Sequence, residues 1–156
     1  MAKAGYAVVT GGAVALSAAT AKSVLGVKAP SGNGIDLKKF RVAFDGVTAT
    51  NVPVLVELCA ATFATNSPGT NSTSVTPVQV YGRAVTVGAT AARTWTTEPT
   101  VLTVIGEFLL SPAGGVVFYD FPLGDTPDSA VSEGFVIRCN APAVVNVRAS
   151  LEFERC

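Results

Sequence analysis

The sequence contains no histidine and has few charged residues. Of its 156 residues, only 14% are Asp, Glu, Lys or Arg, against an average of about 25%. The absence of histidine removes the commonest general base and the commonest metal ligand, and with them every Ser-His-Asp or Cys-His arrangement. The formal net charge is zero, and no basic run suggests nucleic-acid binding. We therefore expect a protein that is not an enzyme and does not bind nucleic acid.

Cysteine is scarce as well, and its spacing excludes the common metal motifs. The three cysteines, Cys59, Cys139 and Cys156, include no CxxC pair, so a zinc site is not supported. Cys59 and Cys139 lie in strand-like runs, where a thiol usually acts as a small hydrophobe. A bridge between these two is the alternative. We expect three reduced thiols in a protein made in the cytoplasm.

The sequence offers no strong ligand or phosphate site. Asp120, Asp125 and Asp128 are crowded in DFPLGDTPD, but their spacing does not match an EF-hand loop. Asp beside Pro and Gly is typical of turns. The glycine-rich pieces lack the GxxxxGK[ST] phosphate-binding frame. We expect neither a metal nor a cofactor.

The first thirty residues allow two interpretations. MAKAGYAVVTGGAVALSAATA has the lysine and apolar stretch of a signal peptide, but Thr10, Gly11 and Gly12 interrupt that stretch. A turn between two short strands fits better, so residues 1–30 are expected to form an extended N-terminal arm or a hairpin. No window of about 18 uninterrupted apolar residues is present, and a transmembrane helix is not expected.

Alternation of apolar and polar residues is the dominant pattern. In residues 133–139, Phe135, Ile137 and Cys139 point to one side and the intervening residues to the other. Residues 144–154 alternate in the same way. The NAPA sequence between them predicts an antiparallel hairpin. The residues that share the apolar face of the last run are Val145, Val147, Ala149, Leu151 and Phe153.

No segment shows a convincing helical period, and turn signals recur every 8–12 residues. This spacing is typical of sandwiches and barrels. We predict one all-β domain over residues 1–156, an antiparallel, jelly-roll-like β-sandwich of about eight to ten strands with little or no helix.

A long polar stretch, residues 58–82, carries no charged side chain. Such a stretch can be a flexible linker. It can also be a loop that another subunit covers without the cost of desolvating charged side chains. We favour the second interpretation and expect contacts through residues 64–77 and 88–99. Trp95, the only tryptophan, is either an interface anchor or a core residue under a loop. The predicted assembly contacts are Asn66, Asn71, Thr73, Arg93 and Trp95.

The chain resembles small β-sandwich structural proteins of tailed bacteriophages, the capsid decoration or cement proteins and their relatives. The resemblance rests on the order of segments AVALSAATAKSVLGVKAP, DLKKFRVAFDGV, VPVLVELCAATFAT, TPVQVYGRA, WTTEPTVL and EGFVIRCNAPAVVNVRASLEFE. It implies a jelly-roll-like domain, often trimeric, on the exterior of a capsid. It implies no catalytic residues.

Together these observations give two function hypotheses. The first is a virion structural protein, made in the host cytoplasm, that self-associates as a homotrimer and binds the major capsid protein. The alternative is a carbohydrate-binding jelly-roll module of a phage tail or fibre, motivated by Trp95, Tyr81, Tyr119 and the Asp-containing loop. An enzyme ranks below both because histidine is absent.

Overall fold

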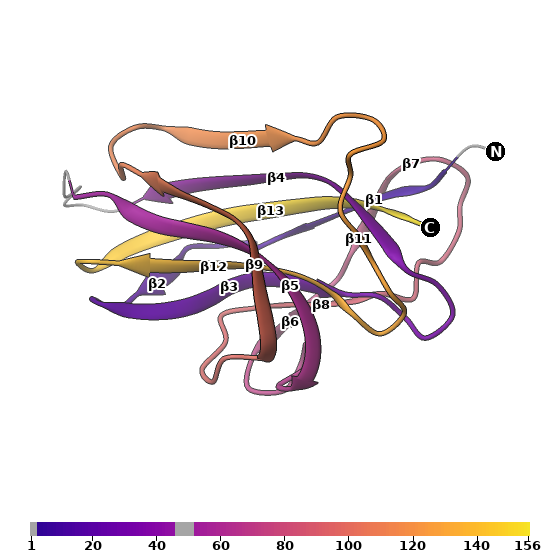
Figure 1. Ribbon diagram of the computed structural model, residues 1–156, viewed down its shortest axis with the longest axis horizontal. Coiled ribbons are helices and arrows are strands. Elements are labelled where there is room, and N and C mark those ends of the chain that lie inside the picture. Colours follow the sequence, from indigo (N-terminus) through magenta and orange to yellow (C-terminus); the bar gives the residue numbers. More distant parts are fainter. Residues whose placement is uncertain (1–2, 46–51) are drawn as a thin grey trace.

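A computed structural model describes residues 3–45 and 52–156 and shows two antiparallel sheets packed face to face (Figure 1). The described residues form thirteen strands and no helix, so the predicted all-β sandwich is confirmed. The strand count exceeds the predicted eight to ten because several strands are only two or three residues long and leave little pattern in the sequence.

The first sheet, sheet A, has seven strands; five follow the order β10-β4-β13-β1-β7, β11 pairs with β4 and β2 pairs with β13. Its edges are therefore β10 and β7. The strands are β1 (Gly5–Val9), β2 (Val14–Leu16), β4 (Ile35–Asp45), β7 (Val78–Tyr81), β10 (Val116–Asp120), β11 (Asp128–Ser129) and β13 (Val145–Arg155).

The second sheet, sheet B, has six strands in the order β6-β8-β3-β12-β5-β9. Its central strands are the longest runs of buried residues in the chain. The strands are β3 (Thr20–Lys28), β5 (Val54–Thr65), β6 (Thr73–Val75), β8 (Thr90–Arg93), β9 (Thr100–Leu110) and β12 (Gly134–Ala141). Most connections cross from one sheet to the other, as in Greek-key and jelly-roll sandwiches.

The main core lies between the sheets and follows the predicted alternation. Phe135, Ile137 and Cys139 of β12 are buried in it, as is the apolar face of β13 from Val145 to Phe153. A second, smaller core lies on the opposite face of sheet B. It consists of Cys59, Ala61, Phe63, Ala92, Trp95 and Val136, with Leu102 packed against it.

Two sequence predictions about connectivity are wrong. Strands β12 and β13 do not form a hairpin, because β12 pairs with β3 and β5 in sheet B while β13 pairs with β4 and β1 in sheet A. Similarly, β1 and β2 do not pair with each other. Both lie against β13, one after the other, with the turn at Gly11-Gly12 between them.

The N-terminal segment is part of the sandwich. Strands β1 and β2 belong to sheet A, and β3 is an inner strand of sheet B between β8 and β12. Tyr6, Val8, Val14, Leu16 and Val24 are all buried in the main core. The described residues from Lys3 onward therefore do not form the extended arm that the sequence allowed.

Candidate protein-interaction surface

Several charged residues of sheet A form ion pairs with one another. On its outer face Lys39 Nζ lies 3.1 Å from Glu152 Oε2, directly across from it in the β4–β13 register. Arg148 Nε lies 2.7 Å from Asp45 Oδ2. Cross-strand pairs of this kind are compatible with a face exposed to water, and each contributes about 0–1 kcal/mol.

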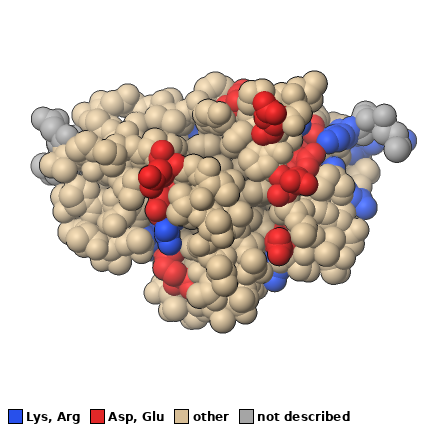
Figure 2. All heavy atoms as spheres, viewed as in Figure 1, with Lys and Arg blue, Asp and Glu red and all other residues tan. Residues whose placement is uncertain are grey.

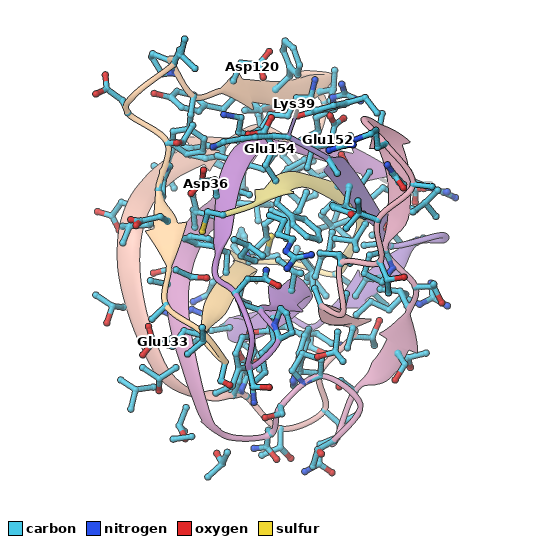
Figure 3. The ribbon with its side chains drawn as sticks, turned by 90° about the vertical axis from the view of Figure 1, so that its right-hand side faces the viewer. Asp36, Lys39, Asp120, Glu133, Glu152 and Glu154 are labelled. Carbon is cyan, nitrogen blue, oxygen red and sulfur yellow. The ribbon has the colours of Figure 1, made fainter. Side chains whose placement is uncertain are left out.

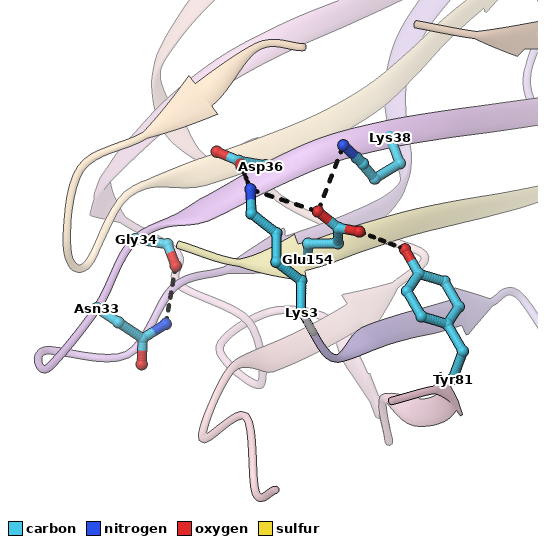
Figure 4. A network of polar contacts seen from close by, with 7 residues as sticks. All are labelled: Lys3, Asn33, Gly34, Asp36, Lys38, Tyr81 and Glu154. Atoms are coloured by element: carbon cyan, nitrogen blue, oxygen red, sulfur yellow. Dashed lines mark hydrogen bonds and ion pairs between the residues drawn. The ribbon is translucent and has the colours of Figure 1, made fainter. Parts of the chain in front are cut away.

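A denser polar network surrounds Glu154 near both termini (Figure 4). Tyr81 Oη donates a hydrogen bond to Glu154 Oε1 at 2.7 Å, and Lys38 Nζ lies 3.3 Å from Oε2. Lys3 Nζ contacts both Asp36, at 2.8 Å, and Glu154, at 3.5 Å. Burial alone would raise the pKa of Glu154, but the bonds from Tyr81 and Lys38 and the charges of Lys38 and Lys3 outweigh it and lower the pKa. Each group has a partner, which favours a structural role.

No group of three or more His, Cys, Asp or Glu residues in the described parts of the chain is arranged to hold a metal ion. Asp120, Asp125 and Asp128 are all exposed, and Asp125 donates its backbone N–H to Pro122 O at 3.0 Å, as in a turn. The turn interpretation of this segment fits that geometry.

The loop in the long uncharged stretch is fixed by hydrogen bonds to another segment of the same chain. Trp95 Nε1 donates to Asn66 O at 2.9 Å, and Asn66 Nδ2 donates to Glu98 O at 3.0 Å. Asn71 Nδ2 donates to Asn66 Oδ1 at 2.7 Å, while Asn71 O accepts from the Thr96 backbone N–H at 2.8 Å. These bonds tie the loop after β5 to the segment after β8. The loop is an ordered cover on the outer face of sheet B.

Trp95 is the centre of that cover. Its side chain is 1% exposed and belongs to the smaller core. The indole lies over Gly26 of β3, where an added Cβ would come within 3.0 Å of Trp95 Cη2. A glycine inside a strand is thereby explained by the close approach of a neighbouring ring. Of the two roles that the sequence left open for Trp95, the structure shows the core residue.

The five predicted contact residues lie in one region, although they differ in exposure. Thr73 of β6 is exposed and pairs with half-buried Arg93 of β8, whose Nη1 donates to Thr10 O at 2.5 Å. Asn71 is exposed and Asn66 is half-buried. The structure thus brings these residues together at the β6 edge of sheet B. Their role in assembly stays a prediction, and a direct contact through the buried Trp95 side chain is ruled out in the folded chain.

The aromatic residues considered for sugar binding are not brought together. Trp95 is buried, Tyr81 is hydrogen-bonded to Glu154 beside β1, and Tyr119 lies on β10 at the opposite edge of sheet A. Tyr119 and Trp95 adjoin two different pockets. The combined aromatic site that the sequence suggested is therefore not formed.

A large share of the exposed apolar side chains lies where sequence reasoning did not place it, on edge strands β9 and β10. Eight of the sixteen large exposed apolar side chains fall between residues 100 and 123. Strands β9 and β10 border the same open side of the sandwich, and we call their exposed apolar side chains the β9–β10 face. Ile105 and Tyr119 line a pocket between the sheets, whereas Val116 lies beside Arg41 on the outer face of sheet A. The exposed apolar residues of the β9–β10 face are Val101, Val104, Ile105, Leu109, Val116, Phe118, Tyr119 and Leu123.

A pocket of about 430 Å³ opens on the β9–β10 face, between the edges of the two sheets. Its walls include Phe40, Ile105, Phe108, Tyr119 and Phe121. The Phe40 ring stacks on Tyr119 and Phe108, with centroids 5.8 Å and 6.1 Å away, and Tyr119 meets Phe121 edge-on at 4.8 Å. Such a preformed aromatic hollow suits an apolar side chain or a flat ligand.

The chain around β9 and β10 is acidic, but basic side chains of β4 adjoin it, because Arg41 lies 5.2 Å from the centre of the Phe118 ring and Lys39 is opposite Asp120 in the register. Between Arg93 and Arg138 the sequence has six acidic residues and no Lys or Arg. Figure 2 shows a mostly uncharged surface, with acidic and basic groups both left of the centre of the view and towards the end that carries both termini. At that end Asp36, Asp120 and Glu133 come from three different segments (Figure 3). The β9–β10 face is thus apolar, with charged groups of both signs at its margins.

A signal for this face was present in the sequence. Residues 99–119 contain a single charge, Glu107, and apolar residues occupy both sides of the β9 pattern. A strand that is apolar on both sides is usually buried on both sides. Here it is an edge strand, so the surplus apolar residues face outward.

No helix of the described residues is long and apolar enough to cross a membrane. No protein family, curated protein or solved structure matches the chain.

Proposed function

We propose that the chain is a non-catalytic virion structural protein that self-associates and binds a capsid shell as a decoration or cement protein. The observation that supports this most is the β9–β10 face, the group of exposed apolar side chains on two edge strands of the sandwich. Apolar patches of this kind, rimmed by polar residues, mark protein–protein contacts. The bacteriophage context comes from the resemblance in segment order.

The other surfaces support the same proposal. The outer face of sheet A carries ion pairs, and the loop around Trp95 packs on the outer face of sheet B. Apolar area that remains uncovered lies at the sheet edges. Many modest contacts of this type, repeated by symmetry, add through multivalency on a shell.

The first test is the solution mass at micromolar concentration, followed by cosedimentation with capsid shells built from the major capsid protein. A homotrimer that pellets with the shells is the expected result. A monomer at every concentration that also stays in the supernatant with the shells contradicts the proposal.

Carbohydrate binding is the second candidate, and the pocket beside Tyr119 is the observation that favours it. Half-exposed Tyr119 supplies an aromatic wall, and Glu107 at the pocket rim supplies hydrogen-bond acceptors. A glycan array decides between the candidates. Glycan binding that Tyr119→Ala abolishes supports this alternative, and an array without binding removes it.

A further inference from the structure

The pocket between β9 and β10 is lined by aromatic rings that stand at different angles. Phe40 is only 5% exposed and forms the floor. Tyr119, which is 48% exposed, and Phe121 form adjacent walls whose ring planes meet at 69°. Phe108 of β9 stacks on Phe40 with an angle of 27° between the rings. Several rings therefore surround one volume of about 430 Å³, a size typical of small-molecule sites.

The lining of this pocket contains no basic side chain. Glu107 at the rim is the only charged residue of the lining, and it makes no ion pair with another residue in the described parts of the chain. It is opposite Glu57 in the β5–β9 register, and Glu57 already lies 2.6 Å from Arg138. Like charges placed opposite each other on neighbouring strands are unfavourable. A cation at the pocket would offset this repulsion.

The basic residues of neighbouring β4 lie on the other face of sheet A. Phe40 and Tyr119 are partners in the β4–β10 register and line the pocket. Lys39 and Arg41 flank Phe40 in the strand, so their side chains point away from the pocket. On that face Lys39 Nζ lies 3.1 Å and Arg41 Nη2 3.5 Å from carboxylate oxygens of Glu152. Both positive charges are therefore outside the pocket and beside an acidic partner.

We infer that this pocket binds a small organic ammonium ion whose nitrogen carries apolar substituents, such as a trimethylammonium group. The negative face of an aromatic ring attracts a cation within about 6 Å of its centroid. Substituents on the nitrogen pack against the apolar lining, whereas a primary ammonium is strongly hydrated and loses more on entry. An anion would meet the ring faces and Glu107, which repel it. This binding goes beyond the proposed capsid role, which neither requires it nor fails with it.

Choline and its uncharged carbon isostere, in which a tert-butyl group replaces the trimethylammonium group, test the inference. The two molecules have nearly the same shape and differ in charge. Each is titrated into the full isotope-labelled chain, and NMR shifts report the affinity and the place of binding. Choline is expected to bind at least about fivefold more tightly than the isostere, as an ordinary cation–π contribution provides. The shifts should centre on Phe108, Tyr119 and Phe121.

A matched pair of variants on β10 locates the site. Tyr119→Ala removes a wall of the pocket and is expected to weaken choline binding at least about fivefold. Phe118→Ala is the control and should leave binding unchanged, because Phe118 is 54% exposed and its ring lies beside Arg41 on the outer face of sheet A. Glu107→Gln removes the rim charge and should weaken binding about two- to fivefold, the range of an exposed ion pair. Circular dichroism checks that each variant is folded.

Three outcomes overturn the inference. Equal affinity for choline and its isostere would show that the pocket selects apolar shape and not charge. The absence of choline binding to the wild-type chain would remove the site altogether. Equal loss in Phe118→Ala and Tyr119→Ala would place binding outside the pocket. If Tyr119→Ala does not fold, the isostere comparison and Glu107→Gln still decide, and none of these results changes the solution mass that tests self-association.

Discussion

Replacing Trp95 by alanine tests whether the uncharged loop is a packed cover or a free excursion. The side chain is 1% exposed, fills the smaller core beside Phe63 and Val136, and donates a hydrogen bond to Asn66 O. Alanine would remove the indole that joins the loop to sheet B. Because the main core is on the other side of the sheet, the sandwich itself should still form.

The cost follows from the burial. Large aromatic residues replaced by alanine in cores lose about 3–5 kcal/mol, a substantial part of the total stability of about 5–15 kcal/mol. For a domain of this size, 1 kcal/mol corresponds to about 2–4 °C in Tm, so Trp95→Ala should lower Tm by about 6–20 °C. Trp95→Phe keeps most of the apolar volume and loses the hydrogen bond, so we expect a loss of about 1 kcal/mol.

Thermal unfolding followed by circular dichroism measures both variants against the wild type. Since Trp95 is the only tryptophan, wild-type fluorescence reports on this site alone. A buried indole should emit at short wavelength and resist quenching by acrylamide. Emission at the wavelength of free tryptophan, together with a Tm for Trp95→Ala within about 2 °C of the wild type, would refute the description of the loop as a cover.

Three further predictions concern thiols, pH and the ion pair on the outer face of sheet B. In the native protein a thiol reagent should label exposed Cys156 and spare Cys59 and Cys139, whose pKa values burial raises to about 11 and about 12; mass spectrometry after labelling with and without denaturant checks this. Glu154→Gln should destabilise the protein at neutral pH. The folded-state pKa of Glu154 is lowered, so its contribution to the free energy of unfolding is present above the unfolded value of about 4.3 and is lost as pH falls through the folded pKa. Urea titrations should therefore show that the stabilities of the wild type and the variant converge in acid. Glu57→Gln removes the partner that lies 2.6 Å from Arg138 Nε, and the unpaired guanidinium should cost about 1–3 kcal/mol in the same titration; an unchanged midpoint would contradict that estimate.

Residue alternation predicted the faces of the strands because side chains of a strand point alternately to its two sides. Phe135, Ile137 and Cys139 are buried in the main core as predicted, and the apolar face of β13 is buried from Val145 to Phe153. Cys59 lies in the smaller core, on the opposite side of sheet B from Cys139. The two thiols therefore point apart, and both are free.

Strand pairing could not be predicted from the same pattern. A turn signal such as NAPA shows that the chain reverses, but in a sandwich the next strand can join either sheet and still bury the same apolar face. The β12–β13 connection crosses between sheets, so the predicted hairpin failed although both strands were correctly located. The same ambiguity applied to β1 and β2, which both pair with β13.

The absence of charge in residues 58–82 indicates a surface that is easily desolvated, but it does not indicate whether the same chain or another subunit contacts that surface. The prediction was that a neighbouring subunit lies against this stretch. In the structure the part within β5 is buried at Cys59 and Phe63, and the loop that follows is held by bonds among Asn66, Asn71, Trp95 and Thr96, although none of residues 64–82 is fully buried. An uncharged surface costs little to desolvate whichever partner arrives, so composition alone cannot separate the two cases.

The arrangement of charge limits how this sandwich can meet other molecules. A flat outer face could bind a partner, but on sheet A that would require breaking or desolvating pairs such as Lys39–Glu152 and Arg148–Asp45. On sheet B it would require displacing the loop anchored by Trp95. Contacts at the sheet edges require neither broken ion pairs nor a displaced loop, because β7, β9 and β10 already expose apolar side chains and have few charges to desolvate. Contacts between copies should therefore form edge to edge, which extends the sheets from one copy towards the next and leaves their faces accessible.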